Sequence, residues 1–183
     1  MLVELVMVVT VGLILTMAVI PRINRSAYDA DAGARVVRGA LQTAQRLAVA
    51  QQADVVVGFD LANHRLRVLE DLNGNGRYDA GAGLRERITY RPLDPGARFA
   101  APPSRPGGGA TPTTALANVT DLVDALPSVT FHRDGAASEN GEAYLRAVRG
   151  GNTEWRAVVV ARATGRVEWW ARAGGGAWVR RGL

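Results

Sequence analysis

The sequence predicts an α+β protein in which a long N-terminal helix, transmembrane and then amphipathic, packs on an antiparallel β-sheet. Three observations predict this fold class. The chain opens with an apolar run over 2–20 that contains one charged residue, Glu4. A helical spacing of apolar residues continues to about Gln51. Past Gln52 the spacing changes to the alternation that is typical of strands, so we expect one folded body behind the helix.

The run 2–20 is long enough to cross a membrane as a helix. At 1.5 Å per residue it extends about 29 Å, close to the thickness of a hydrocarbon core. A cleaved signal peptide is the alternative, but it needs a basic region and a small-residue cleavage site, which this run does not have. We expect a single span, with Gly12 and Pro21 as weak points where the helix can kink. Together with Glu4 they are the candidate assembly residues of this segment.

The helical pattern then narrows to one apolar stripe, which suits packing on a sheet. We divide the sequence into a transmembrane and assembly segment at 1–21, the amphipathic half of the same helix at 22–52, and an antiparallel β domain at 53–183. The stripe consists of Val36, Val37, Ala40, Leu41, Ala44, Leu47 and Ala48.

Within the β domain, the alternation predicts a meander of strands interrupted by one long connection. The segment 92–128 is rich in Pro and Gly and predicts a mobile loop. Inside it, helical spacing from Leu116 to Leu126 predicts a short helix. Strands are predicted at 54–60, 64–70, 84–91, 128–133, 142–148, 155–162 and 166–172, with 177–181 as a last edge.

Glu4 is the unusual residue of the apolar run. A carboxylate in or near a bilayer costs several kcal/mol unless it meets a partner. The first basic side chain, Arg22, lies about 27 Å along the helix, which leaves an N-terminal amine, its own or a neighbour's. Glu4 therefore predicts side-by-side assembly of such helices. An ordinary anchor that tolerates a Glu near the interface is the alternative.

The segment "LVEL", its apolar continuation and Pro21 resemble the N-terminal segment of type IV pilins and of the pseudopilins of type II secretion. The resemblance implies removal of a leader, methylation of the new N-terminus, and pairing of Glu4 with the amine of an adjacent subunit. Met1 stands where the second mature residue of that family would be. We expect either a start assigned at an internal Met or a truncated chain.

The segments "VTFHRDG" and "RAVVVARATGRVEWW" are similar to the C-terminal core of the GspH/FimT-like minor pseudopilins and minor pilins. This resemblance implies a structural subunit, not an enzyme, at the tip of a filament of a type II secretion or type IV pilus-like system. It implies other pilins and an inner-membrane assembly platform as partners. It also implies a single-pass location in the bacterial inner membrane, with the C-terminal domain in the periplasm. A simple anchored domain without an assembly role remains open.

The C-terminal end is the basic end of the chain. All basic residues are Arg, and the excess of Arg over acidic residues from Trp155 onward equals the net charge of +5. Relatives with a GRxR-like turn have been associated with DNA uptake; Gly165 and Arg166 match it, but Glu168 replaces the second Arg. Core packing with a solvated basic edge is the preferred interpretation. The candidate DNA-binding residues are Arg166, Arg172, Arg180, Arg181 and Trp178.

The segment "DLNGNGRYD" has the spacing of the first part of a calcium-binding EF-hand loop. At the position where an EF-hand has a Glu that binds calcium through both oxygens, this chain has Ala82. Glu86 could reach in from the next strand. A hairpin turn built from Asn-Gly pairs is the preferred alternative, and calcium is the one candidate cofactor. The candidate ligands are Asp71, Asn73, Asn75 and Asp79.

Catalytic signatures are weak. The two histidines, His64 and His132, fall in different predicted hairpins, and neither stands in a recognisable Ser-carboxylate arrangement. The chain has no cysteine, which excludes disulfides and thiolate metal sites. We predict that the protein is not an enzyme.

Overall fold

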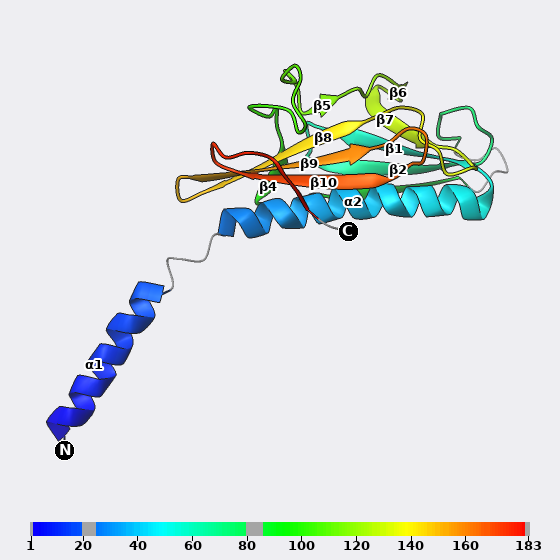
Figure 1. Ribbon diagram of the computed structural model, residues 1–183. Coiled ribbons are helices and arrows are strands. Elements are labelled where there is room, and N and C mark those ends of the chain that lie inside the picture. The colour runs from blue at the N-terminus through cyan, green and yellow to red at the C-terminus, as the bar shows by residue number, and fades with distance from the viewer. Residues whose placement is uncertain (1, 20–24, 80–85, 182–183) are drawn as a thin grey trace.

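The computed structural model describes residues 2–19, 25–79 and 86–181, without the side chains of 14–19. Two helices open the chain, α1 (Leu2–Val19) and α2 (Arg25–Gln51) (Figure 1). The helical pattern ends at Gln51, as predicted. The predicted continuity of the two helices, and Pro21, fall on residues 20–24, outside the described residues. Over the described ranges, no helix combines the length and the hydropathy that crossing a membrane requires.

The rest of the described chain forms antiparallel β structure, so the α+β class is confirmed. Two sheets are present where the sequence predicted one. Their strand orders are β3-β2-β1-β7-β6 and β11-β10-β9-β8-β4, and β5 also pairs with β8. The strands are β1 (Asp54–Asp60), β2 (Arg65–Asp71), β3 (Arg87–Pro92), β4 (Ala97–Phe99), β5 (Leu116–Ala117), β6 (Leu122–Val123), β7 (Leu126–Phe131), β8 (Glu142–Arg149), β9 (Asn152–Val160), β10 (Val167–Ala173) and β11 (Val179–Arg181).

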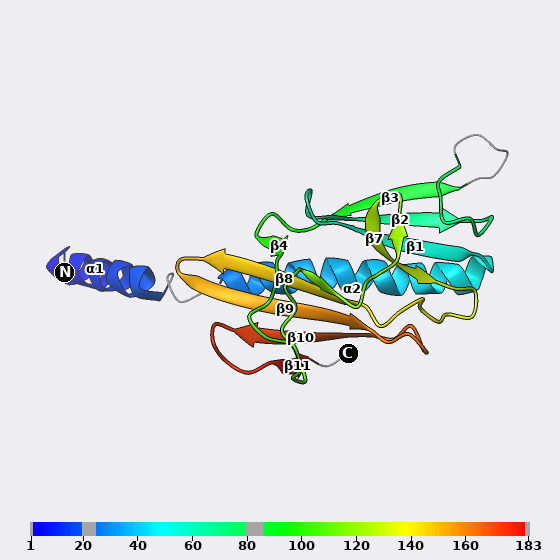
Figure 2. The ribbon, with the colours of Figure 1, turned by 90° about the horizontal axis from the view of Figure 1, so that it is seen from above.

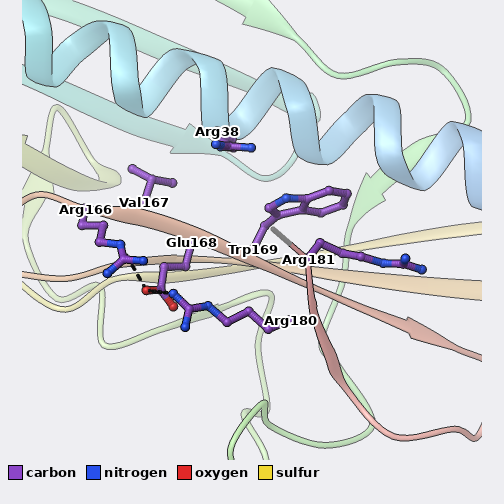
Figure 3. Close-up of a pocket in the computed structure, with 7 residues that line it drawn as sticks. All are labelled: Arg38, Arg166, Val167, Glu168, Trp169, Arg180 and Arg181. Atoms are coloured by element: carbon purple, nitrogen blue, oxygen red, sulfur yellow. Dashed lines mark hydrogen bonds and ion pairs between the residues drawn. The ribbon is translucent and has the colours of Figure 1, made fainter. Parts of the chain in front are cut away.

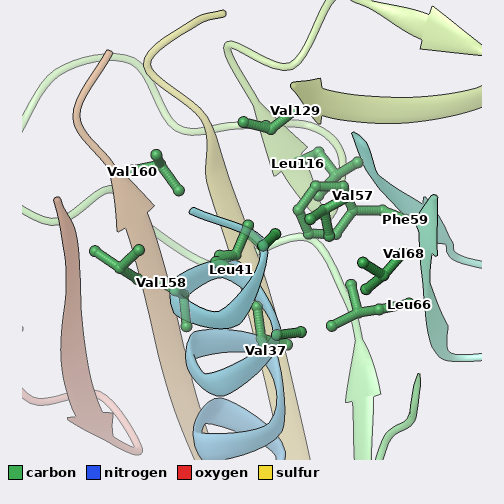
Figure 4. Packing of buried hydrophobic residues seen from close by; sticks show 14 of the residues in the cluster. Val37, Leu41, Val57, Phe59, Leu66, Val68, Leu116, Val129, Val158 and Val160 are labelled. Carbon is green, nitrogen blue, oxygen red and sulfur yellow. The ribbon is translucent and has the colours of Figure 1, made fainter. Parts of the chain in front are cut away.

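The amphipathic helix α2 joins the two sheets. It contacts strands of both, and Figure 2 shows it running along the seam between them. Its stripe supplies Val37 and Leu41, both essentially inaccessible to solvent, to a core shared with Val57, Phe59 and Val158 (Figure 4). Burying such a side chain contributes about 1.5–3 kcal/mol, so the predicted stripe is what fixes α2 on the body.

The short helix predicted from Leu116 to Leu126 is wrong. Leu116 pairs with Ala143 as part of β5, and Leu122 pairs with Pro127 in the β6–β7 ladder. Main-chain groups of this segment therefore bond to other strands, and a helical spacing of apolar residues does not exclude that outcome.

The long connection is attached to the second sheet by a buried carboxylate, Glu142. Arg105 Nε donates to both Glu142 oxygens at 3.0 Å, and the buried Tyr144 hydroxyl donates to the same carboxylate. Burial and this hydrogen bond together raise the pKa of Tyr144 far above its usual value. The hydroxyl therefore stays protonated and keeps donating to Glu142 within β8, while the ion pair of Arg105 with the same carboxylate holds the connection near β8.

Candidate functional site

Helix α1 presents apolar side chains on all sides. Nine large hydrophobic residues between Leu2 and Leu13 are exposed, from 80% for Leu2 to 49% for Val11. The Thr10 hydroxyl donates to the main-chain oxygens of Val6 and Met7 at 2.9 Å, so this polar group is satisfied within the helix. The described surface of α1 therefore suits an apolar surrounding rather than water.

Two of the three predicted assembly residues, Glu4 and Gly12, lie on α1. Glu4 stands in its first turn, among exposed hydrophobic side chains. A Cβ added at Gly12 would meet nothing within 4 Å, so the structure supplies no neighbour that requires a glycine there. Pro21 is outside the described residues. The assembly role of these three residues stays a prediction.

A cleft of about 360 Å³ lies between α2 and the β10–β11 edge (Figure 3). Glu168 on β10 is one of the residues that line it: Arg166 Nε lies 3.3 Å from the Glu168 Oε1, and Arg180 Nη2 lies 2.5 Å from the same oxygen. The residue that replaces the second Arg of the GRxR-like turn thus partly neutralises two of the predicted DNA-binding arginines.

Two further arginines line this basic cleft. Arg181 was among the predicted residues, whereas Arg38 on α2 was not, because it lies far from the basic end in sequence. Within the described part of the chain, the Arg38 Nε is buried without a hydrogen-bond partner. Four arginines thus line the cleft: Arg166 and Arg180 pair with Glu168, whereas Arg38 and Arg181 lie apart from that carboxylate (Figure 3).

The remaining two candidates, Arg172 and Trp178, have structural roles. Arg172 Nη1 donates to Ser104 Oγ at 3.0 Å and its Nε to Gly176 O at 2.6 Å. Trp178 Nε1 donates to the main-chain oxygen of Ser104 at 3.1 Å. Both side chains thus attach the long connection to the β10–β11 end of the sheet, and their role in binding a nucleic acid stays a prediction.

The Gly-Arg turn before β10 is shaped by a contact with α2. Gln45 Nε2 donates to Gly135 O and to Thr164 O, each at 2.8 Å, and so holds two turns against the helix. Gly165 has φ +61°, and a Cβ there would lie 2.2 Å from Gly135 O. Packing of the body therefore requires glycine at this position, independently of any binding role of the neighbouring Arg166.

The EF-hand-like segment is closed by its own hydrogen bonds. Asp71 accepts the main-chain N–H of Gly74 at 2.8 Å and of Gly76 at 2.7 Å. The side-chain amides of Asn73 and Asn75 both donate to one oxygen of Asp79, at 2.7 and 2.6 Å. The oxygens that would bind calcium thus accept N–H groups of the loop, which is the geometry of an Asx-stabilised turn.

Glu86, the proposed distant ligand, does reach this loop. Its Oε2 accepts the main-chain N–H of Asp79 at 2.8 Å, and its Oε1 is buried without a partner among the described residues. Ala82 falls within 80–85, outside the description. No group of three or more His, Cys, Asp or Glu in the described ranges is arranged to hold a metal ion.

His132 makes a structural contact. Its Nδ1 lies 3.1 Å from Asp54 Oδ2, which links the end of β7 to the start of β1. His64 lies in the turn between β1 and β2, where its Nδ1 is buried without a partner in the described structure. The absence of enzymatic activity remains a prediction.

Comparison with known proteins found a similar solved structure. No family model matches the chain, and no curated protein matches it. A solved structure, the minor pseudopilin EpsH from the type 2 secretion system of Vibrio cholerae, is similar, with a TM-score of 0.47 and 14% sequence identity. The similarity covers 81% of this chain and 99% of that chain. This neighbour is a minor pseudopilin, the class that the sequence resembles.

Proposed function

We propose that the chain is a structural minor pseudopilin, anchored in the bacterial inner membrane by one N-terminal span, with its body in the periplasm. It assembles through α1 at the tip of a filament of a type II secretion or type IV pilus-like system. Its partners are other pilins or pseudopilins and the inner-membrane assembly platform. The observation that carries the proposal is the exposed apolar surface of α1 with Glu4 in its first turn.

The exposed side chains of α1 supply the driving force for its association with lipid or with other helices. Moving one large hydrophobic side chain from water to an apolar surrounding contributes about 1.5–3 kcal/mol. The described residues of α1 carry nine such side chains in the first three turns or so, whereas α2 has already buried its stripe on the sheets. The free energy for association therefore resides in α1, and lipid or other apolar helices provide the matching surface.

Glu4 supplies specificity. Its carboxylate raises the cost of placing α1 in an apolar phase, and pairing with the N-terminal amine of a neighbouring subunit offsets that cost. Glu4 thus favours packing beside another helix of the same kind.

The test uses native host membranes that carry a tagged full-length chain. We expect wild-type protein to co-purify with pilin-type subunits, identified by mass spectrometry. Glu4→Ala should remain in the membrane fraction but lose most of these partners. Leu5→Ala, one residue along the same helix, is the control and should retain them. Equal recovery of partners by Glu4→Ala and wild type would contradict the role of Glu4.

A second candidate function is DNA binding by a FimT-like minor pilin during natural transformation. The observation that favours it is the basic cleft, in which Arg38 joins Arg166, Arg180 and Arg181. Glu168 opposes it, because it pairs with two of them and repels phosphate. We expect binding no tighter than about 10 μM at physiological salt, within the non-specific range.

The discriminating variant is Glu168→Arg, which removes the carboxylate and adds the second Arg of the turn. We expect it to gain measurable affinity for labelled duplex DNA, with a slope of log affinity against log salt near −3 for three to four phosphate contacts. Micromolar or tighter binding by the wild type, lost on Arg166→Ala, would place DNA uptake before secretion.

A further inference from the structure

A second groove lies on the opposite flank of α2 from the basic cleft. Its volume is about 550 Å³, and it separates α2 from strands β2 and β3. The floor is apolar and includes Val36, Leu47 and Val68. We call it the β3 groove. Neither assembly through α1 nor DNA binding at the basic cleft uses this groove.

The outer wall of the β3 groove is a sheet edge. Strand β3 ends the order β3-β2-β1-β7-β6, and within the described chain it pairs with β2 alone (Figure 2). Thr89 and Arg91 lie opposite Val68 and Leu66, so they share the face that looks toward α2. An extended chain added to β3 would hydrogen-bond through its main chain and direct alternate side chains toward the groove.

The rim of the groove is basic. Arg35, Arg87 and Arg91 line it together with one carboxylate, Glu70. Glu70 already lies 3.5 Å from Arg87 Nε and accepts Gln51 Nε2 at 2.9 Å. Among the described residues, Arg35 and Arg91 have no carboxylate within ion-pair distance. An occupant that carries carboxylates is therefore matched to the rim, and one that carries cations is not.

We propose that the β3 groove binds an extended segment of a partner protein that adds to β3 as a further strand, and that the side chains of this segment facing the groove, at every second position, include both apolar and acidic residues. The apolar side chains fill the floor beside Leu47 and Val68. The acidic side chains meet Arg35 and Arg91. This inference stands on β3 and α2 alone and does not depend on filament assembly through α1.

The probe is a fluorescent peptide of about nine residues, a length that suits one strand. Valine and glutamate follow each other at the alternate positions that face the groove, and threonine occupies the outward positions. The protein is the full-length chain in lipid nanodiscs, so that no free detergent competes for the groove. We expect saturable binding in fluorescence anisotropy. A peptide with lysine in place of glutamate should bind at least about tenfold more weakly, and one with N-methylated main-chain amides should not bind, because strand addition requires those amides.

Gly39 offers a variant that blocks the groove without disturbing the core. A Cβ at this helical position would meet nothing within 4 Å, so a larger side chain enters the open space of the groove. Gly39→Trp should weaken peptide binding by at least about tenfold. Gly39→Ala is the matched control, since it changes helix propensity in the same direction without filling the groove, and it should bind like wild type.

Charge is tested separately at the rim. Arg91→Glu should weaken binding of the peptide that carries glutamate and strengthen binding of the peptide that carries lysine in its place. Arg98→Glu, at an exposed position of β4 outside the groove, should change neither. The proposal is overturned if the acidic peptide shows no saturable binding up to about 1 mM, if Gly39→Trp binds like wild type, or if the N-methylated peptide binds equally well.

Discussion

Helix α1 and the body that follows it differ in where their side chains find contacts. In the body, α2 buries its apolar stripe on two sheets, and loop carboxylates such as Asp71 accept hydrogen bonds from their own loop. In α1, Leu2 and its neighbours remain largely exposed over the described residues. The comparison teaches that the body buries its own apolar surface, whereas the apolar side chains described in α1 stay exposed. The predictions below test that division.

Removing α1 should give the largest effect. We expect the full-length chain to sediment with cytoplasmic membranes and a variant that starts at Ser26 to be soluble and folded, because α2 and the sheets supply the whole described core. Cell fractionation and circular dichroism measure this. Full-length protein recovered as a soluble monomer without detergent would contradict the division between the two regions.

Replacing one leucine by alanine in each helix should change the free energy of unfolding of the body by very different amounts. Leu41 on α2 is 1% exposed, and Leu41→Ala should lower the free energy of unfolding by about 2–5 kcal/mol. Leu5 on α1 is 68% exposed, and Leu5→Ala should change the free energy of unfolding by less than about 0.5 kcal/mol. Urea denaturation followed by tryptophan fluorescence reports the body, where all four Trp residues lie. A similar loss in both variants would show that α1 also stabilises the body.

A smaller effect is expected where α2 holds the Gly-Arg turn. Gly165→Ala imposes an unfavourable φ and a clash with Gly135 O, which should cost about 2–3 kcal/mol. Gly150 has φ +56° but open space around its Cα, so Gly150→Ala should cost only about 1 kcal/mol. The difference in thermal or urea stability measures the turn's contact with α2. Equal losses would mean that the turn relaxes away from Gln45.

The smallest effect is expected from calcium. Since the oxygens of Asp71 and Asp79 already accept loop N–H groups, about 1 mM calcium should shift the melting temperature of the body by less than about 1 °C. Differential scanning fluorimetry of the Ser26 variant, with magnesium as control, measures this. A rise of several degrees that Asp71→Ala abolishes would show that the loop is a calcium site.

Much of the secondary structure could be predicted from sequence. Alternation placed β1, β2 and the four strands from β7 to β10 close to where they lie, because each half-buried strand repeats the same local pattern. The error at 116–126 has the same origin: apolar residues of three short strands happened to fall at helical spacing. Local periodicity cannot report which distant strand a main chain pairs with.

The candidate sites were predicted less well. Arg166, Arg180 and Arg181 do meet at one cleft, but Arg38 was missed because no pattern around it in α2 signals the contact. Arg172 and Trp178 were candidate DNA contacts, and the structure adds that both donate to Ser104 of the long connection. The relevant partners are separated by more than sixty residues in each case, so only the folded chain shows them.

The sequence by itself determined the apolar character of 2–20, the end of the second helix at Gln51, and the antiparallel class of the body, since these follow from local hydrophobic periods. The tertiary structure alone decided that the strands form two sheets with α2 along their seam. That seam creates a basic cleft on one flank and the β3 groove on the other, because side chains far apart in sequence come together only when the long-range strand register is set.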